Sequence, residues 1–217
     1  MRAFKNRDEA GHRLAEALSG LDLSNPLILA IPRGAVPMGE ILSRELGGEL
    51  DVVLVRKIGA PENPEFAIGA VDENGDLLLS REAALFGIGR EEAEFSRKRE
   101  LSVIRERRRL WGEGCPPVDP SGRTVIVVDD GIATGATMEA ALRFLRKRKP
   151  ERLIAAVPVA PPGTLDRIRP LADRVICLLT PENFQAVSQF YDEFPQVSDE
   201  EVREVLARRG AGDHSPG

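Results

Sequence analysis

An apolar strand, two carboxylates, a loop with two glycines and the start of a helix follow one another in Val125-Ile126-Val127-Val128-Asp129-Asp130-Gly131-Ile132-Ala133-Thr134-Gly135-Ala136-Thr137. The β-branched residues predict a strand buried on both faces, and the pattern becomes helical at Thr137. Gly131 and Gly135 allow backbone conformations closed to other residues, so several N–H groups can turn toward one anion. Thr134 and Thr137 add hydroxyl donors, and Thr137 is also a candidate helix cap. We therefore expect an anion at residues 131–137.

Asp129 and Asp130 stand where the predicted strand ends. Adjacent carboxylates repel each other and resist the loss of water unless hydroxyls, amides or a cation satisfy them. A ligand with a phosphate at one end and neighbouring hydroxyls at the other would match both the loop and the acidic pair. A ribose 5-phosphate has this structure. The alternative is a strand end whose Asp and Thr side chains only cap the helix.

The order of these residues resembles the signature of the type I phosphoribosyltransferases, which use 5-phosphoribosyl 1-pyrophosphate (PRPP). The resemblance implies that Asp129 and Asp130 bind the ribose hydroxyls and act in catalysis. It also implies a set of residues that bind the 5-phosphate, namely Gly131, Ile132, Ala133, Thr134, Gly135, Ala136 and Thr137. The metal that the family uses is Mg²⁺, held mostly by the substrate, with Asp192 as a further candidate ligand.

A second strand-loop-helix unit occupies residues 27–46. Its strand, 27–31, runs into the turn 32–35 and the helix 36–46, which places backbone amides and the Arg33 guanidinium at one loop. This loop resembles the pyrophosphate-binding loop of the family, with Arg33 and Gly34 as the contacts. By the same resemblance a non-proline cis peptide falls around Arg33-Gly34. The alternative is an ordinary turn with a surface arginine.

Two cations, Arg56 and Lys57, follow the predicted strand 51–55. They would lie at the carboxyl edge of the sheet, where open α/β sheets bind ligands. Lys57 resembles the basic residue that contacts PRPP in the family, so the resemblance places it with the catalytic residues. Both cations are candidates for binding pyrophosphate.

A hairpin is predicted between these cations and a long helix. Residues 66–71 and 76–79 flank Asp72-Glu73-Asn74-Gly75, which is a good turn sequence. A charged helix at 90–110 follows, with Phe95, Leu101, Ile104 and Leu110 expected on one face. The hairpin corresponds to the flexible lid of the family, which would exclude water from a reactive ribosyl intermediate.

The remaining pattern alternates helices and strands. We expect a covering helix at 8–18 with an apolar face of Ala10, Leu14, Ala17 and Leu18, a strand at 153–159, a helix at 163–171 and a strand at 174–179. A closing helix at 198–209 is predicted to be capped by Ser198 and Glu201. This alternation implies an α/β fold with a doubly wound, mostly parallel sheet. The predicted organisation is one domain, 1–217, with a lid and its helix at 60–110, a C-terminal hood at 181–210 and a tail at 211–217.

Aromatic residues make up only 5% of the chain, and several of them gather in the predicted hood. A planar base could stack there, so Phe184, Phe190 and Tyr191 are candidates for a base pocket, and Val159, at the end of the predicted strand 153–159, could line it. The alternative is that these rings only pack the hood together.

Composition excludes several classes of protein. The 217 residues include 42% hydrophobic residues, but no apolar run approaches the roughly 20 that span a bilayer. No signal peptide is evident, so we expect a cytoplasmic protein without a membrane partner. A net charge of −5 argues against a nucleic-acid partner. Cys115 and Cys177 are too few for a zinc motif or a disulfide framework, and Cys177 is expected to pack in the interior.

The preferred hypothesis is a Mg²⁺-dependent transferase of nucleotide metabolism. It would move the 5-phosphoribosyl group from PRPP to a nitrogen acceptor such as a nucleobase and release pyrophosphate. Enzymes for 6-oxopurines usually carry a carboxylate where this chain has Ala133, so the resemblance favours adenine- or uracil-type acceptors. Two alternatives stay open, a PRPP- or nucleotide-binding regulator without efficient turnover and a general phosphosugar-binding protein. Family members are often dimers, so a homodimer is possible.

Overall fold

The chain divides into two compact units. The computed structural model describes residues 3–60, 67–80, 83, 85, 87–111 and 116–208. The first unit comprises Met1–Val53 and Cys115–Gly217, and the second comprises Leu54–Gly114. The second unit contains the predicted lid and its helix, and it begins at Leu54 rather than at residue 60.

The first unit is built on a five-stranded parallel sheet with the order β2-β1-β6-β7-β8. Its strands are β1 (Leu27–Ala30), β2 (Glu49–Val52), β6 (Thr124–Val128), β7 (Arg152–Val159) and β8 (Arg174–Leu179). Strands β1 and β6 lie side by side in the interior of the sheet and are buried along their whole length. Continuous apolar strands of this kind need cover on both faces.

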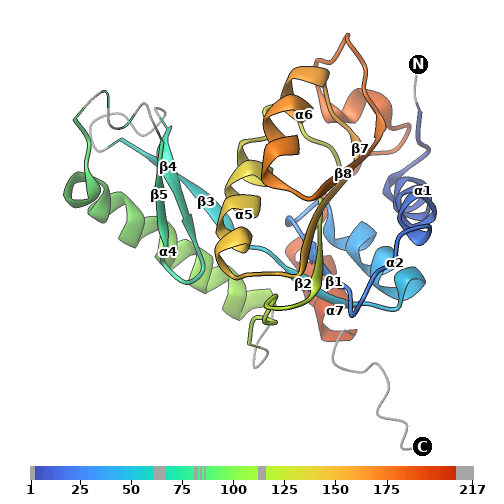
Figure 1. The fold of residues 1–217 in the computed structure, drawn as a ribbon, viewed down its shortest axis with the longest axis horizontal. Helices are drawn as coiled ribbons and strands as arrows, with labels where there is room; N and C mark the ends of the chain where they lie inside the picture. The colour runs from blue at the N-terminus through green and yellow to red at the C-terminus, as the bar shows by residue number, and fades with distance from the viewer. Residues whose placement is uncertain are drawn as a thin grey trace, which may run out of the picture. The chain divides into compact units, whose positions relative to one another are not determined.

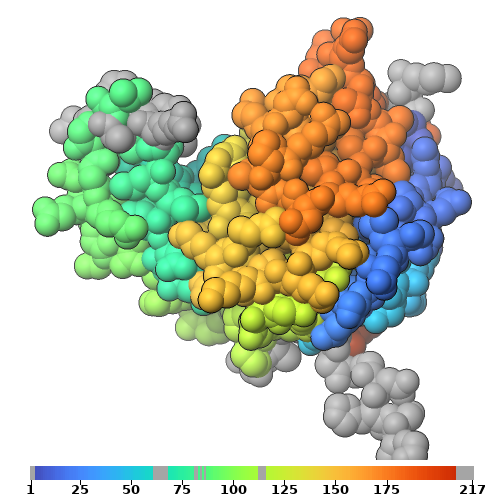
Figure 2. Space-filling view, in the orientation of Figure 1, coloured from blue at the N-terminus to red at the C-terminus, as the bar shows by residue number. Residues whose placement is uncertain are grey.

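Helices supply that cover on both sides of the sheet (Figure 1). They are α1 (Arg7–Ser19), α2 (Val36–Leu46), α5 (Ala136–Lys147), α6 (Pro162–Ile168, continued by the 3₁₀ turn η1, Arg169–Leu171) and α7 (Asp199–Arg208). Helices α1 and α2 pack together on one face, and α5 and α6 lie on the other. In the space-filling view, α5, α6 and β8 form one continuous surface (Figure 2). The predicted doubly wound α/β fold is confirmed.

Helix α1 differs from its prediction at one position. Leu14 and Leu18 are fully buried as expected, but Ala17 is exposed and Ala15 is buried in its place. The reason is the close packing of α2, because a Cβ at Gly11 would lie only 3.1 Å from Ile41 Cδ1. This approach turns the buried face of α1 toward Gly11 and Ala15.

The last helix begins with the predicted capping box. The Ser198 hydroxyl accepts a hydrogen bond from the Glu201 N–H (3.1 Å), and the Ser198 N–H donates to Glu201 Oε2 (2.7 Å). Helix α7 then packs on α2 through a face that includes the buried Val202, Val205 and Leu206. The predicted cap is confirmed. Residues 209–217, including the predicted tail, lie outside the described part of the chain.

The second unit contains a three-stranded antiparallel sheet of β3 (Val55–Gly59), β4 (Ala67–Asp72) and β5 (Leu77–Leu79). Helix α4 (Arg90–Trp111) packs on β3 and β4. The predicted hairpin turn is confirmed, with Gly75 at φ +81° and the Asp72 carboxylate accepting from the N–H groups of Asn74 and Asp76. Phe66 lies outside the described residues.

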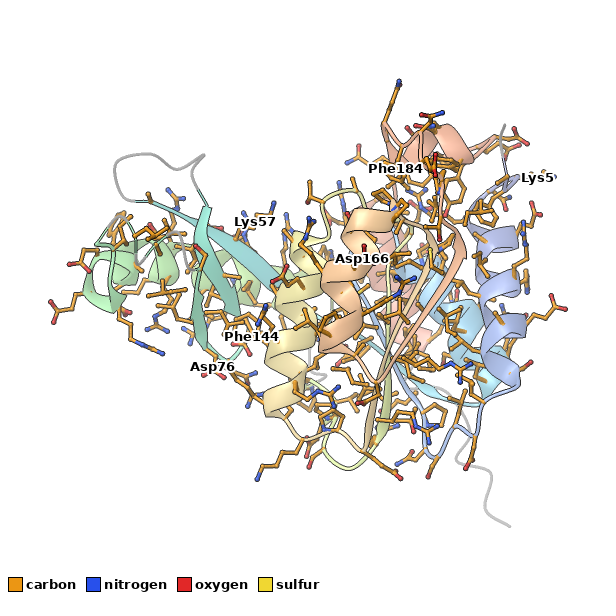
Figure 3. The ribbon with its side chains drawn as sticks, turned by 45° about the horizontal axis from the view of Figure 1, so that its top comes forward. Lys5, Lys57, Asp76, Phe144, Asp166 and Phe184 are labelled. Atoms are coloured by element: carbon orange, nitrogen blue, oxygen red, sulfur yellow. The ribbon has the colours of Figure 1, made fainter. Side chains whose placement is uncertain are left out.

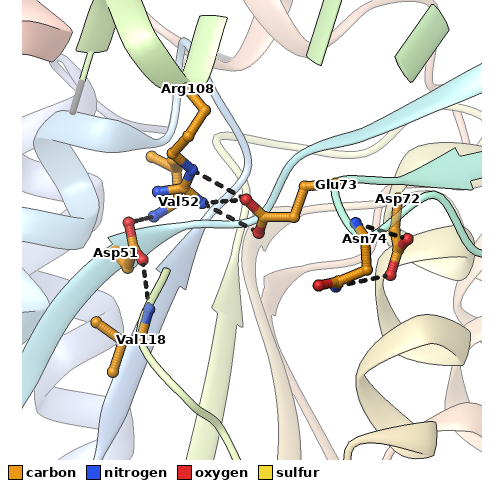
Figure 4. A network of polar contacts seen from close by, with 7 residues as sticks. All are labelled: Asp51, Val52, Asp72, Glu73, Asn74, Arg108 and Val118. Carbon is orange, nitrogen blue, oxygen red and sulfur yellow. Dashed lines mark hydrogen bonds and ion pairs between the residues drawn. The ribbon is translucent and has the colours of Figure 1, made fainter. Parts of the chain in front are cut away.

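Buried or half-buried carboxylates anchor both units (Figure 4). In the second unit, the Arg108 guanidinium donates to both oxygens of Glu73 at 2.9 and 3.1 Å. In the first unit, Asp51 is 1% exposed and its two oxygens accept from the N–H groups of Val52 and Val118. The Asp51 carboxylate thus satisfies the backbone N–H groups of Val52 and Val118, whereas Glu73 pairs with a side chain.

Two predictions about this region are wrong. The strand predicted at 51–55 is two strands, because β2 ends at Val52 and β3 begins at Val55 in the other sheet. Phe95 and Leu110 of α4 are 75% and 49% exposed, whereas Leu101 and Ile104 are buried. Phe95 follows the buried Ala93 by two residues, which places it about 200° around the helix, on the opposite face.

Two further sequence predictions concern membranes and cysteines. None of the helices that the structure describes is long and apolar enough to cross a membrane. Cys177 is partly buried on β8, and burial raises the pKa of its thiol, as expected for a packing residue rather than a nucleophile. Cys115 lies outside the described residues.

We predict that Ser198→Ala lowers the free energy of unfolding by about 1 kcal/mol, because the first turn of α7 loses its hydroxyl acceptor. Urea unfolding measures this change. Ser188→Ala is the matched control, since the exposed Ser188 hydroxyl makes no hydrogen bond within the described chain. Equal effects of the two substitutions would show that the cap does not stabilise the fold.

Candidate functional site

Two loops meet at the carboxyl edge of the parallel sheet. Strands β1 and β6 pair in register, with Ala30 opposite Val128, and the Ile31 N–H donates to the Val128 carbonyl at 2.9 Å. The loops that follow, 32–35 and 129–135, therefore leave the sheet side by side. They touch at Gly34, where a Cβ would lie only 2.0 Å from Asp130 Oδ2. The predicted pyrophosphate loop and the predicted ribose-binding carboxylate are thus direct neighbours.

The loop from Gly131 to Gly135 has the geometry of an anion site. Gly131 and Gly135 have φ values of +148° and +73°, which favour glycine. A Cβ at Gly131 would also meet Val187 Cγ1 at 2.5 Å, so this position has no room for a side chain. The N–H groups of residues 133–138 donate to no acceptor among the described residues. They stand at the N-terminus of α5, where the helix dipole favours negative charge.

Thr137 does not cap α5. The cap is Gly135, whose left-handed conformation starts the helix at Ala136, one residue earlier than predicted. Thr134 is exposed in the loop and Thr137 is half-buried in the first turn.

Residues of α6 hold the loop from the other side, and the sequence analysis missed them. The Thr164 hydroxyl donates to the Ala133 carbonyl at 2.6 Å, and the Arg167 guanidinium donates to the Thr134 carbonyl at 2.5 Å. These two bonds hold the loop backbone, while the N–H groups of residues 133–138 have no acceptor among the described residues. No local signal in the sequence links residues 31 and 33 positions apart in this way, since the contacts arise because β6 and β7 are neighbours and the loop after β6 meets the helix after β7.

The two carboxylates of the acidic pair each use one oxygen within the protein. Asp129 Oδ1 accepts from the Asp130 N–H at 2.9 Å, and Asp130 Oδ2 accepts from Arg7 Nε at 2.8 Å. No donor among the described residues reaches Asp129 Oδ2 or Asp130 Oδ1. Two acceptor oxygens are therefore available, which matches the number of hydroxyls on a 1,2-diol.

The acidic pair is in an unfavourable environment for charge. Burial raises the pKa of Asp129 well above its usual range, and the negative charge of Asp130 raises it further. Burial also raises the pKa of Asp130, but the Arg7 guanidinium opposes that rise. Arg7 was missed by the sequence analysis, because the helix was expected to begin after it.

The predicted pyrophosphate residues are divided between the two units. The loop does contain a non-proline cis peptide, at Pro32–Arg33, one bond before the predicted position. The Arg33 guanidinium is 31% exposed and lies 3.5 Å from Asp199 Oδ2. Arg56 and Lys57 do not follow a strand of the parallel sheet as predicted, since both lie within β3. There, Arg56 donates to Glu100 Oε2 at 2.5 Å, and Lys57 is exposed (Figure 3).

The aromatic residues of the hood mostly pack against one another. Tyr191 is 2% exposed, lies between Phe4 and Phe194 with ring centroids 5.4 and 4.7 Å away, and donates its hydroxyl to the Asp130 carbonyl at 2.7 Å. Its ring is occupied by Phe4 and Phe194, which argues against stacking of a base on Tyr191, and its place in the base pocket stays a prediction.

The other candidate base-pocket residues differ in exposure. Phe190 is 6% exposed and packs on the half-buried Phe184 (Figure 3), so burial also argues against stacking of a base on Phe190. Val159 is fully buried beneath Gly131. Phe184 therefore keeps the most accessible ring of the predicted pocket.

Asp192, the predicted additional metal ligand, is exposed. Its N–H donates to the Phe4 carbonyl at 2.9 Å. Within the described residues, no group of three or more His, Cys, Asp or Glu side chains could hold a metal ion.

Comparison with known proteins decides the family. A family model described as "Phosphoribosyl transferase domain" matches residues 4–195. The chain belongs to this family. The match covers both loops, the acidic pair and the residues of the second unit.

Individual relatives support the same assignment. A Mycobacterium tuberculosis protein provisionally named a phosphoribosyl transferase is 37% identical over 212 residues, which are 96% of this chain and 47% of that protein. The chain thus spans about half the length of this curated relative. An adenine phosphoribosyltransferase of Clavibacter sepedonicus is 33% identical over 59% of this chain and 72% of its own length. The crystal structure of TT1426 from Thermus thermophilus is similar with a TM-score of 0.86 and 46% identity, covering 95% of this chain and 98% of that one.

We predict that Asp129→Asn stabilises the ligand-free protein at neutral pH, because the asparagine keeps the Oδ1 acceptor and removes a charge that burial and Asp130 disfavour. A raised folded-state pKa means that the folded protein binds the proton more tightly than the unfolded chain. Stability therefore falls as pH rises from the unfolded-state pKa through the folded-state pKa. The advantage of asparagine is complete above that window and vanishes below the ordinary value of 3.8.

Thermal unfolding of the two proteins in acidic and neutral buffers of equal ionic strength measures this difference. Asp166→Asn, on the exposed surface of α6 (Figure 3), is the control and should show no comparable gain. A loss of stability in Asp129→Asn at neutral pH would contradict the electrostatic interpretation of the pair.

Proposed function

We propose that this chain transfers the 5-phosphoribosyl group from PRPP to a nitrogen atom of a nucleobase-like acceptor and releases pyrophosphate. The observation that carries the proposal is the contact of Gly34 with Asp130, which joins the two loops into one site. An anion loop, two free carboxylate oxygens and a second loop with a guanidinium follow one another across it. This order matches the 5-phosphate, the ribose hydroxyls and the pyrophosphate of PRPP.

Each group of residues has one role in the proposed reaction. The N–H groups of residues 133–137, with the Thr134 and Thr137 hydroxyls, bind the 5-phosphate. Asp129 Oδ2 and Asp130 Oδ1 accept hydrogen bonds from the ribose hydroxyls. Pyrophosphate lies at the loop 32–35, where it competes with Asp199 for the Arg33 guanidinium, and Arg56 and Lys57 remain candidates for additional contacts.

Catalysis in this proposal is electrostatic. The bond between the ribose C1 and the pyrophosphate oxygen breaks with its electron pair going to pyrophosphate, and positive charge develops on the ribose ring. Charged groups already in position stabilise such a change without reorganisation. The carboxylates face the developing positive charge, and the Arg33 loop faces the departing anion. Fixing the substrate at three points also supplies the orientation that the acceptor nitrogen needs.

Magnesium is part of the proposal. Mg²⁺ prefers phosphate oxygens and water to closed protein cages, which fits a described chain that has no cluster of metal-ligating side chains. Pyrophosphate would hold most of the metal, with the exposed Asp192 as the candidate protein ligand. The metal would neutralise charge on the leaving group.

The proposed acceptor is of the adenine or uracil type. Ala133 lacks the carboxylate with which 6-oxopurine enzymes exchange a proton with the base, and the Clavibacter relative is named for adenine. A regulator that binds PRPP without turnover differs from this proposal in its lack of pyrophosphate release, so the same assay separates the two.

We predict that PRPP with Mg²⁺ binds the wild-type protein in isothermal titration, and that one of adenine, uracil, xanthine or orotate triggers pyrophosphate release. Asp129→Asn should reduce the rate of release by at least about tenfold, because a charged acceptor to a ribose hydroxyl is lost. Asp166→Asn is again the control. Binding without release from any acceptor would favour the regulator, and no binding of PRPP would refute the proposal.

We also predict that EDTA abolishes pyrophosphate release and that added Mg²⁺ restores it, because the leaving group needs its charge neutralised. The folded state should be indifferent to EDTA, because in this proposal the substrate and not the protein holds most of the metal. Thermal unfolding with and without EDTA checks the second point. Release that persists in EDTA would remove magnesium from the mechanism.

A further inference from the structure

We propose that Arg7 is a positioning residue that fixes the Asp130 carboxylate, so that Oδ2 is held by the protein and Oδ1 faces the ligand. The inference rests on the proposed function, in which that ligand is the ribose of PRPP. It assigns a role in the site to the N-terminal helix, which lies far from the signature loop in the sequence.

The contacts of Arg7 determine its orientation. Although charged, Arg7 is only 8% exposed. Its Nε donates to Asp130 Oδ2 at 2.8 Å, its terminal nitrogen donates to the Pro195 carbonyl at 2.5 Å, and its guanidinium carbon lies 3.7 Å from the centre of the Phe194 ring. A buried guanidinium is tolerated only when it is paired in this way. Because the three partners surround a planar group, they leave it little freedom to rotate.

The surroundings of Asp130 complete the constraint. Gly34 lies against Oδ2 on the side of the second loop, where even one additional carbon would meet that oxygen. The Asp130 carbonyl accepts from the Tyr191 hydroxyl at 2.7 Å, so the backbone of the residue is also held. The carboxylate is 14% exposed. Arg7 and Gly34 thus occupy the Oδ2 side, which leaves Oδ1 as the oxygen available to a hydroxyl.

The start of α1 and the residues just before it connect the carboxylate to the hood. The Phe4 N–H donates to the Phe190 carbonyl, and the N–H groups of Asp192 and Glu193 donate to the carbonyls of Phe4 and Lys5. Arg7 extends this attachment to the Pro195 carbonyl. The hood segment 190–195 and Asp130 therefore bind the same guanidinium, so a displacement of the hood segment would also displace the Asp130 carboxylate.

The positive charge of Arg7 also offsets part of the negative charge of the acidic pair. Among the described residues, the titratable groups that act on Asp130 or feel its charge are Arg7 from α1, Asp129 from its own loop and Tyr191 from the hood. Of these three, Arg7 supplies the positive charge. PRPP is itself an anion, so an acidic pair with no adjacent cation would repel part of the molecule that it must bind.

The test compares Arg7→Met, Arg7→Lys and Arg13→Met. Arg13 is the matched control, because it lies on the same helix, stacks on Phe4 at 4.8 Å and donates to the Ala3 carbonyl at 3.0 Å, yet does not contact Asp130. We expect Arg7→Met to weaken binding of PRPP with Mg²⁺ by about tenfold, as for the loss of a charged hydrogen bond. Arg7→Lys should recover part of that loss, and Arg13→Met should bind like the wild type. Where pyrophosphate release is measurable, Arg7→Met should both raise KM for PRPP and lower kcat, since Asp130 in the proposed reaction also faces the transition state.

Thermal unfolding of each variant separates positioning from stability. Equal weakening of PRPP binding by Arg7→Met and Arg13→Met would overturn the inference, because it would reduce Arg7 to a support of the hood. If the wild type itself fails to bind PRPP, the proposed function fails. A double-mutant cycle of Arg7→Met and Asp130→Asn in urea unfolding then still measures whether Arg7 and Asp130 interact. Non-additive effects would support the fixed carboxylate, and additive effects would refute it. Arg7→Lys replaces Arg7→Met in the cycle if the latter does not fold.

Discussion

The parallel pairing of β1 with β6 is the constraint on which the site depends. Because Ala30 lies opposite Val128, the loops after both strands emerge at one edge, and their backbones come close enough for Gly34 to touch Asp130. A side chain at position 34 would push the carboxylate away, and a shift of one residue in the register would separate the loops. The buried side chains of both strands hold that register, because a slip of one residue would move each of them to the opposite face and change its packing partners. Core packing and site geometry are therefore one property of this fold.

The site is held in a state that is unfavourable for the ligand-free protein. Asp129 is half-buried beside a second carboxylate, and the N–H groups of residues 133–138 find no acceptor among the described residues. Such costs are typical of sites that are organised before the ligand arrives. Here the surrounding structure supports them, with Thr164 and Arg167 holding the loop carbonyls and Arg7 holding Asp130.

Much of this could be predicted from the sequence, for identifiable reasons. Most of the strands, the turn at residues 72–75 and the capping box at Ser198 depend on local patterns, and each was found where the pattern placed it. Arg7, Thr164 and Arg167 depend on contacts between segments distant in the sequence, so no local pattern could reveal them. The errors have the same origin. Phe95 is apolar but faces away from the second sheet, and Ala17 is exposed because the packing of α2 turns Ala15 inward instead.

The burial of Tyr191 has a consequence for recognition of the acceptor. Its ring packs between Phe4 and Phe194, and its hydroxyl donates to the Asp130 carbonyl. Tyr191 therefore stabilises the backbone of the acidic pair and presents no stacking surface. Recognition of a base in the proposed reaction would then depend on the half-buried Phe184 and on backbone groups near it. Backbone groups form hydrogen bonds with the edge of a base, whereas an aromatic ring stacks on the face of any planar base. A site of this composition would distinguish acceptors by their donor and acceptor pattern more than by the size of their ring system.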